Sequence, residues 1–216
     1  MLPSDLLAFQ FYPTVHEFIV SRVDVLVADV KAMMRLPLPE VGIEGRCAFA
    51  AATTLCSIIG GVSMVLYKPG VSGRSPAWRF LGLLKEFYPW QGERYSSWQY
   101  AVQDRETRAK VLYELVRNPV AHSFGVLGNN PLRVDIAKER LSEQQIDGLE
   151  KSDVLPYFRA PAVTAHHLTA PGESHPGYVI TVGGLYWGVF HLLWNLAKNE
   201  SQMREAEAHL ATDPNA

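Results

Sequence analysis

The sequence predicts one mainly α-helical domain over residues 1–216: a bundle of about five helices with a small β-hairpin or sheet, within residues 126–183, inserted before the last helix. Apolar residues recur at the helical period through most of the chain. After the middle of the chain, alternation with period two appears in three short segments bounded by turn signals. With 216 residues and no internal repeat, one substantial core is expected.

Three helices are predicted in the first half of the chain, over residues 15–34, 44–67 and 77–88. Prolines end the first helix, and a loop rich in glycine and proline precedes the third. The second helix holds an uncharged stretch, residues 48–66, that is about as long as a membrane span. Its threonines, serines and glycines suit lipid poorly. We therefore expect a central helix packed on all sides, with the small residues allowing close approach.

A fourth helix is predicted from residue 104 onward, with Asp104 as its N-cap. Its apolar stripe consists of Val111, Leu112, Leu115 and Val116. The opposite face carries Glu106, Lys110, Tyr113, Glu114 and Arg117. Because Pro119 lacks a backbone N–H and disfavours the helical conformation of the residue before it, the helix should break or kink at Arg117 or Asn118.

The inserted region is predicted to contain strands at residues 132–136, 160–168 and 178–182. A short helix, residues 142–149, should begin with a capping box formed by Ser142 and Gln145. The last helix is predicted over residues 185–210, and its first half is apolar nearly all round, as in a helix buried in a bundle or at a dimer interface. Residues 199–216 are charged, so we expect a solvated tail that frays.

Composition and charge restrict the classes of function and the cellular location that we expect. The net charge of −2 excludes a global basic field, so any contact with nucleic acid must use a local cluster of cations. Cys47 and Cys56 lie nine residues apart in an apolar run and are expected to be reduced core thiols. The N-terminus lacks the positive segment of a signal peptide. These features favour a cytoplasmic location without membrane association.

Other common enzyme classes find no support in the motifs. The glycine-rich loops that bind triphosphates or dinucleotides are absent, as is the Gly-x-Ser-x-Gly elbow of serine hydrolases. His166, His167 and His175 fall in the inserted region, but no carboxylate at ligand spacing accompanies them. We therefore expect no metal site and no cofactor.

The candidate site is the run from Arg117 to His122, Arg-Asn-Pro-Val-Ala-His, at the end of the fourth helix. A kink at Pro119 would let the side chains of Arg117 and His122 converge on a shared space. Glu114, three residues before Arg117, is placed to hold the guanidinium in one orientation. Tyr113, on the same face, is a second supporting residue.

Two other places have an arginine followed at similar spacing by a histidine. Arg159 and His166 lie in an extended stretch flanked by proline, and Arg204 and His209 lie in the charged C-terminal segment. Only Arg117 has both a polar residue directly after it and a long amphipathic helix before it. The run at Arg117 is therefore the one we pursue.

An arginine, a polar residue, three further residues and a histidine, at the end of an amphipathic helix, resemble the signature of the HEPN superfamily. Members are all-helical domains, and many are metal-independent endoribonucleases of toxin–antitoxin, abortive-infection and RNA-guided CRISPR systems. The resemblance covers Arg117, Asn118 and His122. It implies a homodimer in which two copies of this run face each other and form one composite cleft. The inserted region is absent from the smallest members.

The resemblance also implies a reaction. His122 would transfer protons during attack of a ribose 2′-hydroxyl on the adjacent phosphate. Arg117 would stabilise the charge that develops on the phosphoryl oxygens, and Asn118 would orient one of these groups or the phosphate. The expected product is a 2′,3′-cyclic phosphate formed from RNA without a metal. An antitoxin or another protein is a candidate partner.

Whether the chain is an enzyme at all remains open at this point, because two further hypotheses fit the sequence. In one, the chain is a non-catalytic HEPN-like dimer that binds a nucleotide, an RNA or a protein, with Arg117 paired to Glu114 and His122 serving only as a helix-end histidine. In the other, it is a membrane-associated helical protein with spans at residues 48–66 and 178–196.

Overall fold

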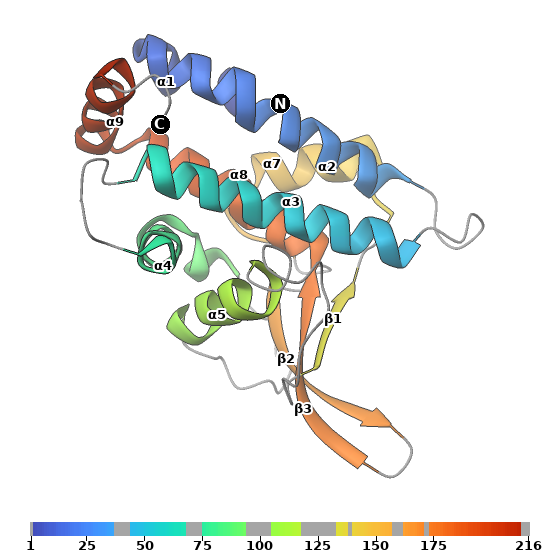
Figure 1. Cartoon of the computed structure of the whole chain (residues 1–216). Coiled ribbons are helices and arrows are strands. Elements are labelled where there is room, and N and C mark those ends of the chain that lie inside the picture. The colour runs from blue at the N-terminus through green and yellow to red at the C-terminus, as the bar shows by residue number, and fades with distance from the viewer. Residues whose placement is uncertain are drawn as a thin grey trace.

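The computed structural model describes residues 2–36, 44–67, 75–93, 105–117, 133–137, 140–156, 162–170 and 173–212. Within these residues the chain is mainly α-helical, as predicted. The helices pack into a bundle, and a narrow three-stranded sheet projects from it (Figure 1). The core lies among the helices, so the sheet extends the molecule rather than forming its centre.

The N-terminal helix lies where the sequence predicts it. Two 3-10 turns, Pro3–Asp5 and Leu7–Phe11, lead into α1 (Pro13–Phe18), a π turn η3 (Ile19–Asp24) and α2 (Val25–Arg35). The residues at both junctions keep right-handed helical dihedral angles, so the three segments form one continuous helix. The buried apolar residues of this helix follow mostly at intervals of four: Val15, Ile19, Val23, Val27, Val30 and Met34.

The π turn has a simple explanation in this spacing. In an α-helix, residues four apart drift by about 40° around the axis at each step. A π turn holds more residues per turn, so it compensates for this drift and keeps the apolar row facing the core.

Helices α3 (Glu44–Val65), α4 (Pro76–Phe87) and α8 (Val182–Ala197) surround the centre of the core. Helix α8 is buried along nearly its whole length, as its apolar sequence predicts. Helix α3 corrects a prediction, because it is not packed on all sides. Ala50, Ser57 and Gly61 are exposed along one face. A Cβ added at Gly60 or Gly61 would meet no atom of the described residues within 4 Å, apart from the backbone of its own helix. These two glycines therefore do not serve close packing between the described residues.

One helix in the described part of the chain, Cys47–Val65, is long and apolar enough to cross a membrane. The two-span hypothesis needs a second span over residues 178–196. That segment is divided between strand β3 (Glu173–Thr181) and α8. Helix α8 has 16 residues, so it is about 24 Å long and shorter than the bilayer core of about 30 Å.

The sheet consists of β1 (Arg133–Ala137), β2 (Val163–Ala170) and β3, in the order β1-β3-β2. Strand β3 pairs antiparallel with β2 and parallel with β1, and it continues directly into α8. Helix α7 (Glu143–Lys151) lies between β1 and β2 in the chain and begins with the predicted capping box of Ser142 and Gln145.

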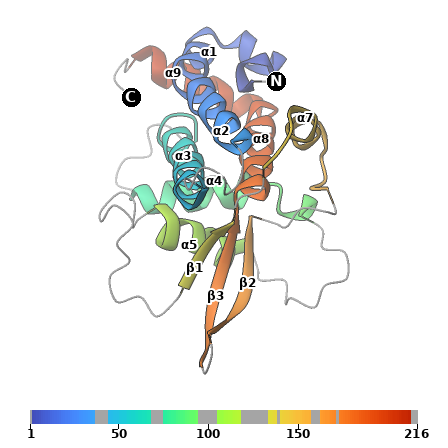
Figure 2. The ribbon, with the colours of Figure 1, turned by 90° about the vertical axis from the view of Figure 1, so that its right-hand side faces the viewer.

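The C-terminal segment differs from its prediction. The single helix predicted over residues 185–210 is divided, because α8 ends at Ala197 and α9 covers Glu200–Thr212. Residues 199–216 were expected to form a fraying tail, yet α9 packs against α1, with Met203, Ala206 and Leu210 buried (Figure 2).

A hydrogen-bonded carboxylate holds α9 in place. The two carboxylate oxygens of Glu207 accept hydrogen bonds from the backbone N–H groups of Thr14 and Val15, at 3.0 and 2.9 Å. These N–H groups belong to the first turn of α1, which has no intrahelical acceptor for them. The prediction of a tail missed this role, because a charge at a helix N-terminus is recognised only once the two helices are packed.

Candidate functional site

The candidate site lies at the end of a helical run that begins with α5 (Arg105–Val111) and continues as the π turn η5 (Leu112–Arg117). Leu112 and Val116 are fully buried, in agreement with the predicted apolar stripe. The run packs on α3 and α4. A π turn is an uncommon element that often occurs at functional sites. Here Arg117 is its last residue.

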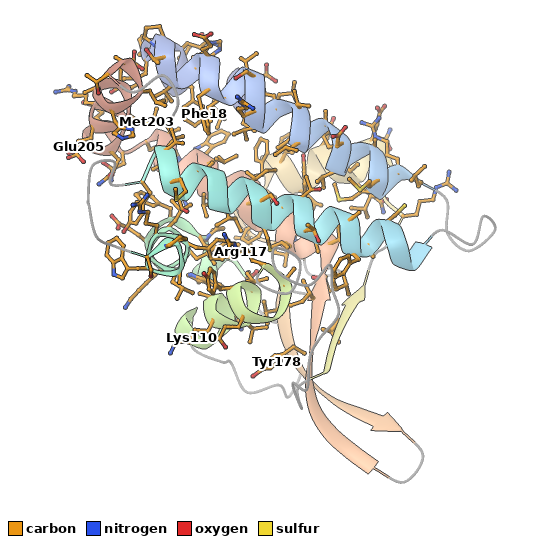
Figure 3. All side chains as sticks on the ribbon, in the orientation of Figure 1. Phe18, Lys110, Arg117, Tyr178, Met203 and Glu205 are labelled. Atoms are coloured by element: carbon orange, nitrogen blue, oxygen red, sulfur yellow. The ribbon has the colours of Figure 1, made fainter. Side chains whose placement is uncertain are left out.

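Arg117 is half-buried and lies between η5 and α3 (Figure 3). Its guanidinium carbon lies 5.4 Å from the centre of the Tyr113 ring, which is the geometry of a cation–π interaction. The Tyr113 ring in turn packs on Phe80 of α4, with 5.3 Å between ring centres. The structure thus places Tyr113 against the guanidinium, and Glu114, on the same helical run, is exposed.

The positive charge of Arg117 acts on the thiol of Cys56 in α3. This thiol is 1% exposed, and burial raises its pKa to about 12, while the nearby positive charge of Arg117 opposes the rise. Cys56 is therefore protonated at neutral pH and acts as a small apolar group. Both Cys47 and Cys56 are free thiols.

The other predicted residues of the site fall outside the described residues. These are Asn118, His122 and the expected kink at Pro119, together with the N-cap at Asp104. The helical run continues to Arg117, which is the first of the two residues at which the sequence predicts a break.

A buried network fixes α5 to the rest of the fold. The Glu93 carboxylate is 3% exposed and accepts hydrogen bonds from the Tyr88 hydroxyl at 2.7 Å, the Ala162 backbone N–H at 3.0 Å and the Arg108 guanidinium at 2.8 Å. Burial raises the pKa of Glu93, and the three donors oppose the rise. The Tyr88 ring lies so close to Gly188 that a Cβ there would overlap it. One carboxylate therefore joins α5, the end of α4, the start of β2 and α8.

A groove between α4 and α5 was not anticipated from the sequence. It has a volume of about 310 Å³ and is lined by Trp78, Leu81, Gly82, Lys85, Ala109 and Lys110. On the α4 side, Trp78, Leu81 and Lys85 follow the helical spacing i, i+3, i+7 and share one face. That spacing is readable in the sequence, but the pairing of this face with Lys110 depends on tertiary packing.

Within the described part of the chain, no three His, Cys, Asp or Glu side chains gather in a way that would hold a metal ion. At the candidate site and in the groove, cations lie beside aromatic rings: Arg117 with Tyr113, and the two lysines of the groove with Trp78. No protein-family model, no curated protein and no solved structure matches this chain.

Proposed function

We propose that the chain is a metal-independent endoribonuclease of HEPN type that acts as a homodimer in the cytoplasm. One observation carries the proposal. Arg117 ends a π turn, its guanidinium lies against Tyr113, and the sequence continues directly with Asn118 and, four residues later, His122. A cation held in one orientation suits the stabilisation of charge on a phosphate.

In this proposal His122 removes the proton from a ribose 2′-hydroxyl, and the resulting oxygen attacks the adjacent phosphorus. The bond from phosphorus to the 5′-oxygen breaks, and the leaving 5′-oxygen takes up a proton. The products are a 2′,3′-cyclic phosphate and a 5′-hydroxyl. Arg117 neutralises the charge on the non-bridging oxygens, and Asn118 orients the phosphate by hydrogen bonds. The paired site of a dimer supplies a second set of these groups.

The second candidate function is a non-catalytic HEPN-like dimer that binds a nucleotide, an RNA or a protein such as an antitoxin. The observation in its favour is that Arg117 is half-buried and packed on Tyr113, which also suits a purely structural cation. Both candidates use the same helical frame. They differ in whether the 2′-hydroxyl of a bound RNA is activated.

The test is cleavage of a mixed RNA pool in excess chelator by the wild-type protein, Arg117→Ala and His122→Ala. We expect cyclic phosphate ends from the wild type and a loss of rate of at least about 100-fold in each variant. Circular dichroism and light scattering check that fold and oligomeric state persist.

The chain offers a matched control for this test. Arg204 and His209 have the same spacing as Arg117 and His122, and Arg204 lies exposed on α9, where it pairs with Glu200. Arg204→Ala and His209→Ala should cleave like the wild type. Equal cleavage by all variants indicates a contaminating nuclease, and no cleavage by any favours the binding function.

A further inference from the structure

The groove between α4 and α5 has two lysines on opposite walls. Lys85 belongs to the last turn of α4, and Lys110 belongs to α5. Both side chains are exposed. Among the described residues, no carboxylate forms an ion pair with either lysine. Two positive charges therefore face one small space, and an anion is the complementary occupant.

The wall between the lysines is aromatic and apolar. The half-buried ring of Trp78 lines the groove and stacks on Tyr67, with 6.4 Å between ring centres. Gly82 lies beside Tyr67, and a Cβ there would come within 3.0 Å of the Tyr67 ring. The absence of a side chain at Gly82 thus leaves room for the Tyr67 ring on which Trp78 stacks. A planar ring fits such a surface better than a hydrated ion does.

The size of the groove restricts its occupant. About 310 Å³ is at the lower end of small-molecule sites. An α-helix of a partner protein, about 10 Å across with its side chains, requires a longer and wider surface. An anion that also carries a planar ring, and fits this volume, has the chemistry of a nucleotide.

We infer that this groove binds one nucleotide of a single-stranded RNA, with the base against Trp78 and the flanking phosphates near Lys85 and Lys110. This inference rests on the proposed function, since RNA is the substrate there. Figure 3 shows Lys110 on the side of α5 away from α3, whereas Arg117 faces α3. The groove is therefore a contact outside the cleavage site, which holds a flanking part of the strand.

The test is binding of a fluorescently labelled 2′-O-methyl oligonucleotide of eight nucleotides, measured by anisotropy. The methyl group removes the attacking hydroxyl, so binding is measured without cleavage. Lys85→Glu and Lys110→Glu should each weaken binding at least about fivefold. The slope of log affinity against log salt should become shallower by roughly 0.7 for each lysine that contacts a phosphate.

The matched control is Lys151→Glu, at an exposed lysine in the last turn of α7, and α7 lies away from α4 and α5 (Figure 1). It should bind within about twofold of the wild type. Trp78→Ala should weaken binding roughly fivefold or more by loss of stacking, and Trp78→Phe should restore part of this. Circular dichroism separates such a loss from misfolding. The lysine variants lie at exposed positions, so they test the groove even if Trp78→Ala does not fold.

Three outcomes would overturn the inference. They are no binding by the wild type, equal binding by all three lysine variants, and displacement of the oligonucleotide by an acidic peptide at lower concentration than by an unlabelled oligonucleotide. The outcome is separate from that of the cleavage test. Binding that depends on Lys85 and Lys110 in a protein that never cleaves RNA supports the groove and removes the catalytic proposal. If the protein cleaves RNA but binds the oligonucleotide equally well without either lysine, the catalytic proposal stands and the groove inference fails.

Discussion

The region around α8 and the region between α4 and α5 differ in whether their polar side chains are paired with one another. Around α8, buried polar side chains have internal partners: the Tyr186 hydroxyl donates to Glu150 at 2.6 Å, Lys31 pairs with the same carboxylate at 2.7 Å, and the Trp187 indole donates to the Ser152 carbonyl at 2.8 Å. Between α4 and α5, two exposed lysines line an apolar groove instead. Polar groups that satisfy one another stabilise a fold, whereas cations facing an open space are available to a ligand.

We therefore associate stability with the α8 side, and the proposed RNA contact lies on the α4–α5 side. The network of Glu93 joins the two sides, because it ties α5 to α8 through Tyr88 and Arg108. Substitutions in the buried networks should therefore change the free energy of unfolding. Substitutions in the groove should change binding at constant stability.

The largest effect on stability is expected at the network that joins the two sides. Arg108→Ala leaves the Glu93 carboxylate buried without its cation and should lower the free energy of unfolding by about 3–5 kcal/mol. Urea unfolding followed by circular dichroism measures this. Arg204→Ala, which removes an exposed pair with Glu200, should change stability by less than about 1 kcal/mol. Equal effects at the two arginines would show that the buried pair does not hold α5.

A smaller loss is expected from Tyr186→Phe on α8. The substitution keeps the ring but removes the hydroxyl that donates to Glu150, which should cost about 1–3 kcal/mol. Tyr178→Phe, at a half-exposed tyrosine of β3, serves as the control and should be nearly neutral. Both are measured by the urea midpoint. If Tyr186→Phe is as stable as the wild type, the remaining partners of Glu150, Lys31 among them, satisfy the carboxylate.

The pH dependence of stability provides a further test of the α8 side. Burial lowers the pKa of His191, and the Leu149 carbonyl, which accepts from its ring N–H at 3.0 Å, and the charge of Asp153 oppose this, while Lys198 adds to the lowering. As pH falls below about 6.5, the unfolded chain binds a proton at His191 more readily than the folded chain does. The contribution of His191 to the free energy of unfolding should therefore be fully present above pH 7 and decline toward pH 5.

His191→Gln separates this histidine from the other titrating groups. Glutamine keeps a donor for the Leu149 carbonyl and does not titrate, so the decline between pH 7 and pH 5 should become shallower. The measurement is thermal unfolding at several pH values. An unchanged slope would mean that other histidines or carboxylates cause the decline.

The sequence predicts the helices well where the start and stop signals agree with the apolar periodicity. The predicted helix over residues 44–67 corresponds to Glu44–Val65, and Ser142 begins α7 as its capping box requires. It missed the break between α8 and α9, where neither glycine nor proline occurs. A weaker signal was present, because Asn199 caps α9 by accepting from the Gln202 N–H. The prediction of one helix over residues 185–210 follows the long apolar run before Asn199 instead of this capping signal.

The candidate site is less predictable than the helices, because it depends on contacts between elements. Spacing places Tyr113, Glu114 and Arg117 on one face, with Tyr113 four residues and Glu114 three residues before the arginine. The contact of Tyr113 with the guanidinium is accompanied by its packing on Phe80, a residue that is distant in the sequence. The groove likewise combines two faces that are distant in the sequence. Each face is periodic by itself, and no local pattern specifies which one it meets.

The smallest expected effect concerns the exposed face of α3. Glycine in a helix costs about 0.5–1 kcal/mol relative to alanine, and a Cβ at Gly61 meets no described atom within 4 Å outside its own helix backbone. If the face is open to solvent, Gly61→Ala should stabilise the protein by that amount in urea unfolding, and the half-exposed Gly60→Ala should behave alike. In the proposed homodimer, a second copy packed on this face would reverse the sign. Gly61→Ala would then lower stability and shift light scattering toward the monomer. That result would place the dimer interface on α3, in addition to the proposed contact at α4 and α5.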